Sequence, residues 1–526
     1  MPAPTRATLA LLTAAVAFSG LACAQQAGTP PPSGTTAAGE ATPAPLPEGA
    51  PPRMARIDRA ELRTHAMWLA DDARRGRLTG SKGQQEAAKY VADHFKELGL
   101  KPLGDKKGYL QHYPLEKVSL EASTSLSFGA TKLNTGLAVF ASGDADRLAL
   151  SGRFAWCGGG KPEELPQALK GRIPVVALRT PPRGQGTVAD FGALQRIADI
   201  AREAASREAA AIVIALLDDQ GAFANAINYG ALQPEHPVLR FQGQGREAQK
   251  PRIPVMVLNK ENGAKLLEHL QVTLGDDGKL VPPATEKATG KLALGVRTDP
   301  KATASNVVAV LEGRELAREA IVYSAHMDHV GVRIDGDPFN GADDNASGTS
   351  GLLEIAQAFA EGEPPARSVV FLAVSGEELG LWGSAWFADH PTWPADRIVA
   401  NVNIDMIGRA EVKDGRIHMQ VTPSHAHEKY STIVRDSVAM AGKLNISLSS
   451  GDTYYQRSDH YNFAKKGIPV VFFCDGEHPD YHQVTDHPDR LDYGSMEAVA
   501  RLAFWTGWEV ANRRERPRDL GAQPAW

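Results

Sequence analysis

From residue 305 onward, continuous apolar runs alternate with amphipathic segments of helical period. The runs occupy residues 307–311, 320–324, 368–374, 398–404 and 468–473. Strands that are buried on both faces read as continuous apolar runs, and parallel strands need helical crossovers between them. The rhythm therefore predicts an α/β fold with a mostly parallel or mixed sheet sandwiched by helices, one of which begins at Ser347.

Residues 134–280 show a separate α/β rhythm and contain few clustered His or acidic residues. We predict strands at 172–178, 211–217 and 253–258, and a helix from Phe191. This block is interpreted as a smaller, non-catalytic module inserted into a larger domain. Upstream of it, residues 57–99 are predicted to be helical, with Gly99 in the C-cap position, and residues 109–128 to form short strands.

The N-terminus is predicted to be an export signal over residues 1–24. Residues 7–24 are apolar or small and follow Arg6, but they are too rich in Ala for a membrane span. Two cleavage patterns occur in this segment. One suits a signal peptidase, and the other is an imperfect lipoprotein box in which Cys23 would carry a lipid anchor. Residues 25–52, rich in Pro, Ala, Gly and Thr, are predicted to form an extended tether.

Composition excludes several classes of protein. The chain has 57 basic and 62 acidic residues, whereas a nucleic-acid-binding domain shows a basic excess. Three cysteines are too few for a disulfide framework.

Outside the N-terminus no segment approaches the length of a membrane span, so we expect a periplasmic, secreted or lipid-anchored protein. Ten of the 15 histidines lie between His326 and His487, which places the chemistry in the C-terminal half.

Metal-binding side chains follow four of the predicted strands, and further carboxylates precede a predicted helix. The strand-end residues are His326 with Asp328, Glu377 with Glu378, Asp405, and His482; Asp343 and Asp344 precede the helix. In open α/β sheets, ligands bind beyond the carboxyl ends of the strands. These side chains are therefore expected to meet at one edge of the sheet.

Two histidines and three carboxylates suit two zinc ions if one carboxylate bridges them. A bridge would hold the ions about 3.5–4 Å apart, as in two-metal hydrolases. The charges of two zinc ions and three carboxylates leave an excess of one positive charge, which favours a bridging hydroxide as the nucleophile. The second Glu of the adjacent pair would then be free to act as a general base.

Five motifs occur in an order that resembles the co-catalytic dizinc aminopeptidases of bacteria, whose relatives include glutamate carboxypeptidase and the transferrin receptor. The motifs are AHMDHVG at 325–331, GADDNASG at 341–348, SGEELG at 375–380, NIDM at 403–406 and YHQVTDHPD at 481–489. The inserted block resembles a protease-associated domain through residues 169–176 and 253–256. The resemblance implies the zinc exopeptidase fold, with peptidase parts at 53–130 and 286–512, the insertion at 131–285, and a tail at 513–526.

The resemblance also implies a role for each site residue. One zinc ion would be held by His326 and Asp405 and the other by Glu378 and His482, with Asp344 as the bridge, Glu377 as the general base, Asp328 accepting the ring N–H of His326, and Tyr455 polarising the scissile carbonyl. The Asp344–Asn345 peptide is expected to be cis. Tyr454, which is adjacent to Tyr455, could take the same role.

Other residues near the motifs receive structural interpretations. Asp343 is predicted to cap the helix that begins at Ser347. Trp382 and Trp386 are predicted to pack in the interior, and Cys474 to be a buried thiol. Four further histidines are predicted to lie beside the site or on the surface, not to bind metal: His329, His460, His478 and His487.

The predicted activity is zinc-dependent removal of residues from peptides with a free N-terminus. A carboxypeptidase is the main alternative, and it would need a cationic pocket for the terminal carboxylate. Arg333, Arg409 and Arg457 lie near the motifs but form no recognisable cluster. A receptor-like relative without activity would have lost metal ligands, and a glutaminyl cyclase relative would lack the first His, so His326 argues against the latter.

Overall fold

In a computed structural model of the chain, the described residues are 46–140, 147–179, 188–218, 227–228, 230–234, 236–241, 253–275 and 279–526. The predicted export signal, Cys23 and most of the predicted tether lie outside these residues. Within the described part of the chain, no helix has the length and apolar character needed to cross a membrane.

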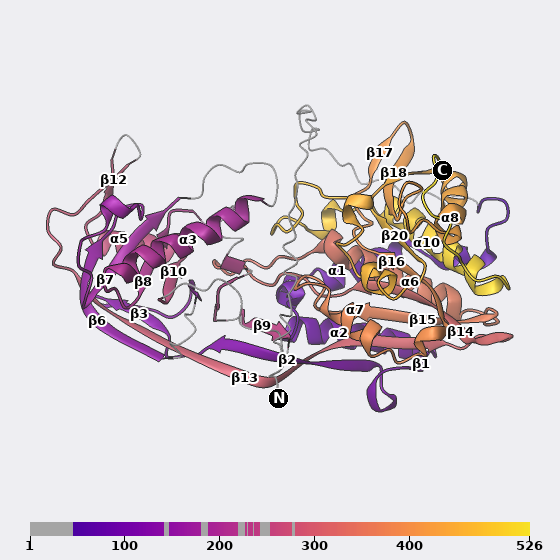
Figure 1. The fold of residues 1–526 in the computed structure, drawn as a ribbon, viewed down its shortest axis with the longest axis horizontal. Coiled ribbons are helices and arrows are strands. Elements are labelled where there is room, and N and C mark those ends of the chain that lie inside the picture. The colour runs from indigo at the N-terminus through magenta and orange to yellow at the C-terminus, as the bar shows by residue number, and fades with distance from the viewer. Residues whose placement is uncertain are drawn as a thin grey trace, which may run out of the picture. The chain divides into compact units, whose positions relative to one another are not determined.

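A mixed sheet forms the body that carries the site motifs (Figure 1). Strand β14 is parallel to β15 and β16, and β16 is parallel to β20, whereas β13 pairs antiparallel with β15 and β18 pairs antiparallel with β20. The bounds are β13 Thr289–Leu311, β14 Leu316–His326, β15 Arg367–Val374, β16 Ile398–Ile404, β17 Glu411–Lys413, β18 Arg416–Thr422, β19 Ile446–Ser450 and β20 Val470–Cys474. The predicted α/β class, with a mixed sheet between helices, is confirmed.

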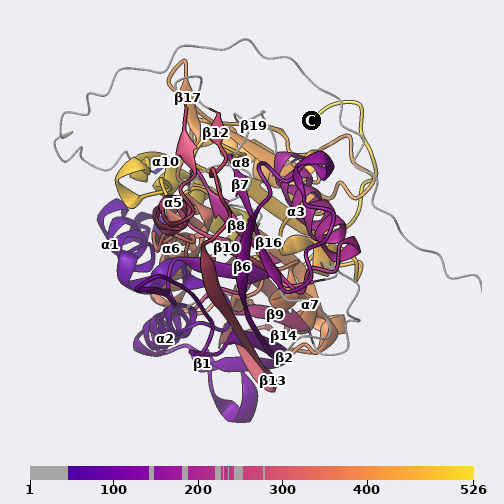
Figure 2. The ribbon, with the colours of Figure 1, turned by 90° about the vertical axis from the view of Figure 1, so that its left-hand side faces the viewer.

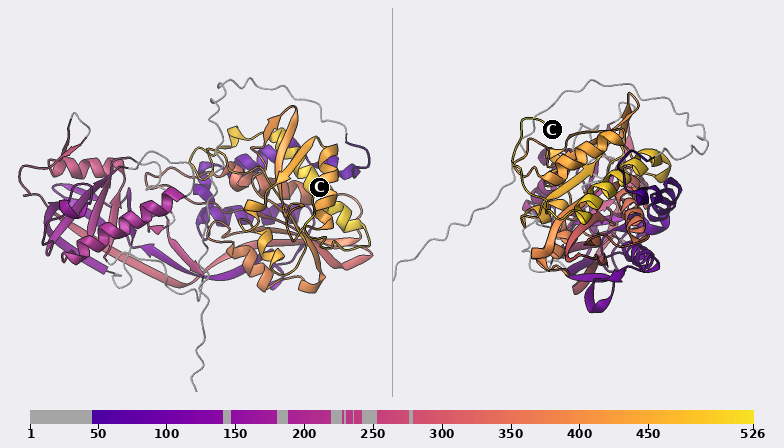
Figure 3. Two further views of the ribbon diagram at one scale, coloured as in Figure 1. Left: turned by 45° about the horizontal axis from the view of Figure 1, so that its top comes forward. Right: turned by 90° about the vertical axis from the view of Figure 1, so that its right-hand side faces the viewer.

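Helices cover both faces of this sheet because successive strand residues point to opposite sides. Val307 and Ala309 of β13 pack in the cluster that contains residues of α1, α2, α6, α8 and α10, whereas Val308 and Val310 pack with residues of α7 and α9. Figure 3 shows α8 and α10 next to each other over the sheet. The bounds are α1 Arg59–Leu69, α2 Lys82–Glu97, α6 Gly348–Ala360, α7 Trp382–Asp389, α8 Thr432–Lys443, α9 His460–Ala464 and α10 Tyr493–Asn512.

The single helix predicted over residues 57–99 is wrong, because the structure has two helices, α1 and α2, with an irregular connection between them. Arg75 and Gly76 of the connection adopt left-handed backbone angles, which end a right-handed helix. A Cβ on Gly76 would lie 1.9 Å from the carbonyl oxygen of Gly331, so the connection presses against the loop that follows β14. Gly99 ends α2 with a φ of 72°, as predicted.

The segment between β2 and β13 builds a second sheet. Strand β13 belongs to both sheets, because its residues 289–295 pair with β6 and its residues 296–307 pair with β2 (Figure 1). The remaining bounds are β1 Lys101–Pro102, β2 Leu110–Leu120, β3 Ser125–Phe128, β4 Thr131–Leu133, β5 Leu137–Phe140, β6 Arg147–Trp156, β7 Arg172–Leu178, β8 Ile212–Leu216, β9 Val238–Phe241, β10 Val255–Leu258, β11 Thr273–Leu274 and β12 Leu280–Val281.

Helices α3 (Val188–Ser206) and α5 (Lys260–His269) lie on opposite faces of the second sheet (Figure 2). Ile212 and Ile214 of β8 pack with residues of α3, and Val213 and Ala215 pack with residues of α5. The alternation follows from the two-residue period of a strand. The segment therefore has apolar cores of its own, and its identity as a protease-associated domain stays a prediction.

Candidate metal centre

The predicted ligands meet at the carboxyl edge of the central sheet. His326 is the last residue of β14, Asp405 follows β16, and His482 lies in the loop after β20. The Nε2 atom of His326 lies 3.1 Å from Asp405 Oδ1 and 3.3 Å from Asp344 Oδ1. The Nε2 atom of His482 lies 3.0 Å from Asp344 Oδ2 and 3.0 Å from Glu378 Oε2. Asp344 therefore directs one carboxylate oxygen to each histidine.

Two groups of potential ligand atoms result, and Asp344 belongs to both. One consists of His326, Asp344 and Asp405, and the other of His329, Asp344, Glu378 and His482, with the atoms of each group within 4.8 Å of one another. These nitrogen and oxygen donors match those that zinc takes in catalytic sites. Buried carboxylates need compensating positive charge. The donor set thus fits a pair of divalent cations.

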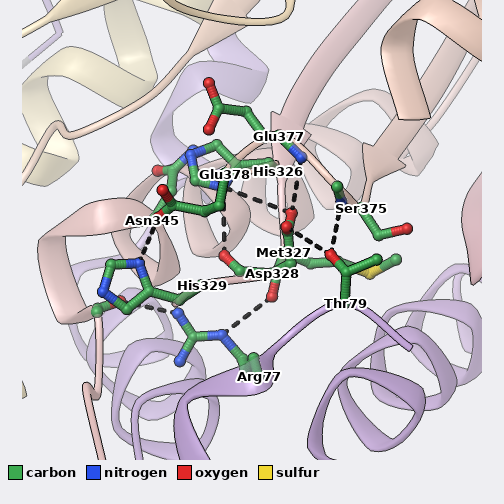
Figure 4. Close-up of polar contacts among 12 residues, drawn as sticks. Arg77, Thr79, His326, Met327, Asp328, His329, Asn345, Ser375, Glu377 and Glu378 are labelled. Carbon is green, nitrogen blue, oxygen red and sulfur yellow. Dashed lines mark hydrogen bonds and ion pairs between the residues drawn. The ribbon is translucent and has the colours of Figure 1, made fainter. Parts of the chain in front are cut away.

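The electrostatics of the pocket separate the two adjacent glutamates. Burial raises the pKa of Glu377 well above its usual range, and the nearby Asp405 and Glu378 add to the rise. Burial and Asp344 would also raise the pKa of Glu378, but His482 and His329 lower it to about 2. Glu377 belongs to neither ligand group, and Figure 4 shows it pointing away from Glu378. The structure thus leaves one of the two carboxylates outside the ligand groups.

His329 belongs to the second ligand group, although the sequence predicts that it lies beside the site or on the surface. Its side chain is fully buried, and its Nδ1 atom lies 2.6 Å from Glu378 Oε1 (Figure 4). The sequence feature that could have indicated this is the position of His329, three residues after His326 and in the loop that follows the same strand. Within the described part of the chain, His460, His478 and His487 belong to neither ligand group.

Asp328 lies beside His326 but not as predicted. The Nδ1 atom of His326 is 3.2 Å from the backbone oxygen of Asp328 and 3.8 Å from its nearest carboxylate oxygen, so the backbone carbonyl is the nearer acceptor. The carboxylate instead accepts the hydroxyl of Thr79 at 2.7 Å and the backbone N–H of Glu377 at 3.4 Å. Thr79 in turn accepts the backbone N–H of Gly376 at 2.8 Å (Figure 4). This chain of hydrogen bonds ties the α1–α2 connection to the backbone of Glu377.

A pocket opens beside Glu377, which we call the acidic pocket. It is lined by Asp344, Glu377, Asp405, Met406, Tyr454, Arg457, Phe472, Cys474, Glu477 and Tyr481. Tyr455, predicted to act on the substrate, is not among these residues. Its ring centroid lies 4.0 Å from that of His427. The neighbouring Tyr454, the alternative for the same role, belongs to the turn at Asp452–Tyr454 and lines the pocket. The role of Tyr455 stays a prediction.

Asp343 does not cap α6 as predicted. Its carboxylate accepts the backbone N–H of Gly408 at 2.7 Å and lies 3.2 Å from His478 Nε2. Asn345 Oδ1 instead accepts the backbone N–H of Gly348 at 2.8 Å. The Asp344–Asn345 peptide is cis, as expected. Trp382, Trp386 and Cys474 pack in apolar clusters, as predicted.

Comparison with known proteins points to one family. Residues 306–506 match the model of Peptidase family M28. Aminopeptidase YwaD of Bacillus subtilis is 25% identical over 283 residues, which are 52% of this chain and 55% of that protein. A probable zinc metalloprotease of Pyrenophora teres f. teres is 34% identical over 245 residues, covering 41% of this chain and 50% of the relative. The chain thus spans about half the length of the curated relatives it matches.

A solved structure extends the likeness in fold. That structure, of BSAP, a zinc aminopeptidase from Bacillus subtilis, aligns with a TM-score of 0.57 and 20% identity, covering 87% of this chain and 96% of its own. The alignment therefore includes most of the chain on both sides of residues 306–506. The predicted resemblance to the dizinc aminopeptidases is confirmed.

Proposed function

Because residues 306–506 match the model of Peptidase family M28, we propose that the chain is a zinc-dependent aminopeptidase acting on peptides with a free N-terminus. The observation that carries the proposal is the position of Asp344, which is shared by two His–carboxylate groups while Glu377 stands outside both. His326, Asp344 and Asp405 would hold one ion, and Asp344, Glu378 and His482 the other. Two bound zinc ions would polarise the scissile carbonyl and lower the pKa of a water molecule.

Glu377 is proposed as the general base. It lines the acidic pocket and belongs to neither ligand group, so its carboxylate can accept a proton from the attacking water. The same carboxyl group can then donate that proton to the departing amine. Tyr454, which lines the same pocket, is placed to donate a hydrogen bond to the substrate.

The charges around the pocket favour an aminopeptidase over a carboxypeptidase. The guanidinium of Arg457 lies 2.6 Å from Glu477, that of Arg409 lies 3.0 Å from Asp480, and that of Arg333 lies within 2.8 Å of two aspartates. Each of these three arginines, which could otherwise bind the terminal carboxylate of a substrate, thus already has a carboxylate partner. The carboxylates of the pocket can instead hold the α-ammonium group of a substrate by charge-assisted hydrogen bonds.

The inner wall of the acidic pocket suits an apolar first residue. Met406, Phe472 and Cys474 line the pocket and pack together as a buried cluster. The proposal also includes export through residues 1–24, with Cys23 as the lipid attachment site if the lipoprotein box is used. It further includes the protease-associated character of the inserted segment.

Blocking the ends of a peptide tests the direction of cleavage. A leucine-initiated peptide should lose its first residue, and acetylating its N-terminus should abolish the reaction. Amidating the C-terminus should change the rate little. The opposite pattern would assign the chain to the carboxypeptidases.

A further inference from the structure

A second pocket lies on the other side of the glutamate pair, and we call it the apolar pocket. It is lined by Leu78, Asn228, His236, Pro237, Val238, Leu239, Val330, Glu378 and Leu379. Glu378 is the residue that links it to the metal centre, whereas the adjacent Glu377 lines the acidic pocket. Among the residues that the structure describes, the two pockets share no lining residue, and each is lined by one glutamate of the adjacent pair.

The polar atoms of Asn228 and His236 in the apolar pocket have hydrogen-bond partners, except His236 Nδ1, which is buried. The Nδ2 atom of Asn228 donates to the backbone oxygen of Val330 at 2.8 Å, and His236 Nε2 lies 3.0 Å from the same oxygen. The Oδ1 atom of Asn228 accepts from Gln233 at 3.2 Å. Apart from Glu378, the contacts left for a ligand are therefore with aliphatic side chains and Pro237. Such a surface binds apolar side chains and excludes charged ones.

Part of this wall comes from the segment between β2 and β13. Pro237, Val238 and Leu239 lie at and before the start of β9, which pairs with β2. The segment is packed tightly against the loop after β14, since a Cβ on Gly331 would lie 2.8 Å from the ring of His236. The loop after β14 also carries Asp328 and His329. The inserted segment therefore contacts the loop that carries these two residues and shares a pocket lining with Glu378.

We infer that the apolar pocket binds the side chain of the second substrate residue and selects apolar residues there. The inference rests on the proposed aminopeptidase activity, in which the acidic pocket holds the α-ammonium group and the first side chain. With the first residue on the Glu377 side, the chain beyond the scissile bond leaves past Glu378. Its first side chain then meets Leu239, Val330 and Leu379.

Two tripeptides test the inference, because Leu-Gly-Gly lacks the side chain that the pocket would bind and Leu-Leu-Gly has it. The wild-type enzyme should hydrolyse Leu-Leu-Gly with a kcat/KM about 10-fold or more above that for Leu-Gly-Gly. Val238→Asp, at a half-buried position of the wall, should remove this preference by lowering kcat/KM for Leu-Leu-Gly to about the value for Leu-Gly-Gly. Leu239→Ala is the second variant, and it should reduce the preference by shortening the wall.

Val281→Asp is the matched control, because Val281 belongs to the same segment, is 47% exposed and is not among the residues that line the pocket. It should keep the wild-type preference. Equal kcat/KM values for the two tripeptides in the wild type would overturn the inference, as would a Val238→Asp variant that slows both equally. A changed preference for the first residue instead of the second would also overturn it. If the wild type hydrolyses neither tripeptide, the aminopeptidase proposal itself fails.

Discussion

Arg77 is the most informative residue to change outside the metal ligands. Its side chain is fully buried, and its guanidinium donates only to backbone carbonyls. The acceptors are the oxygens of Leu69 at 2.7 Å, Met327 at 3.0 Å, Asn340 at 2.7 Å and Gly341 at 2.9 Å. These carbonyls belong to the end of α1, the loop after His326 and the loop before Asp344. One side chain thus joins three segments around the metal centre.

Arg77→Met keeps an unbranched side chain but removes all four hydrogen bonds. A buried polar group left without a partner costs about 1–3 kcal/mol, so four carbonyls at the lower bound cost about 4 kcal/mol. Burial lowers the pKa of Arg77 to about 10, which shows that the charged form is itself costly to bury. Removing that charge offsets part of the loss. We therefore expect the free energy of unfolding to fall by about 2–4 kcal/mol.

Urea unfolding measures the change as a lower midpoint at a constant slope. Zinc affinity should fall as well, because the loops that carry His326 and Asp344 lose their common anchor. Arg77→Lys should not restore either property, since an ammonium group lacks the planar fork of five donors. Arg75→Met, at an exposed position two residues away, is the control and should cost less than about 0.5 kcal/mol. Equal midpoints for the Arg77→Met and Arg75→Met variants would refute the reasoning.

Five further substitutions, in three predictions, test the parts of the site. Glu377→Gln should keep both metal ions yet lower kcat by about 100-fold or more, and a variant with near-wild-type turnover would exclude Glu377 as the base. Asp344→Ala should reduce zinc content at both sites and His326→Ala chiefly at one; a content near two ions per chain in the Asp344 variant would argue against the bridge. Thr79→Val should lower kcat with little change in KM, Thr79→Ser should restore it, and identical kcat values for the two variants would contradict the positioning role.

The positions of the metal-binding residues could be predicted because each follows an apolar strand. Parallel strands place their carboxyl ends at one edge, so the runs ending near Ser324, Val374, Ile404 and Phe473 were enough to bring the ligands together. The approach of His329 to Glu378 could not be predicted, because periodicity gives the end of a strand but not the path of the loop after it. The turn that puts Tyr454 in the acidic pocket in place of Tyr455 is a loop feature of the same kind.

The contribution of the α1–α2 connection could not be predicted from residue types. Arg77 donates to backbone carbonyls, and backbone groups leave no pattern of residue types in the sequence. Thr79 donates to Asp328, which lies about 250 positions away along the chain. The left-handed angles of Arg75 and Gly76 occur where this connection lies close to Gly331, and only the folded chain shows that approach. Likewise, the sharing of β13 between the two sheets could not be predicted. One long strand pairs with β2 in the first sheet and with β6 in the second, and local periodicity does not show that the two parts form one strand.

The location of bound zinc by anomalous diffraction tests the central claim most directly. The account predicts two peaks about 3.5–4 Å apart on either side of the Asp344 carboxylate. One peak should lie beside His326 and Asp405, and the other beside Glu378 and His482. A single peak, or two peaks that Asp344 does not join, would contradict the account.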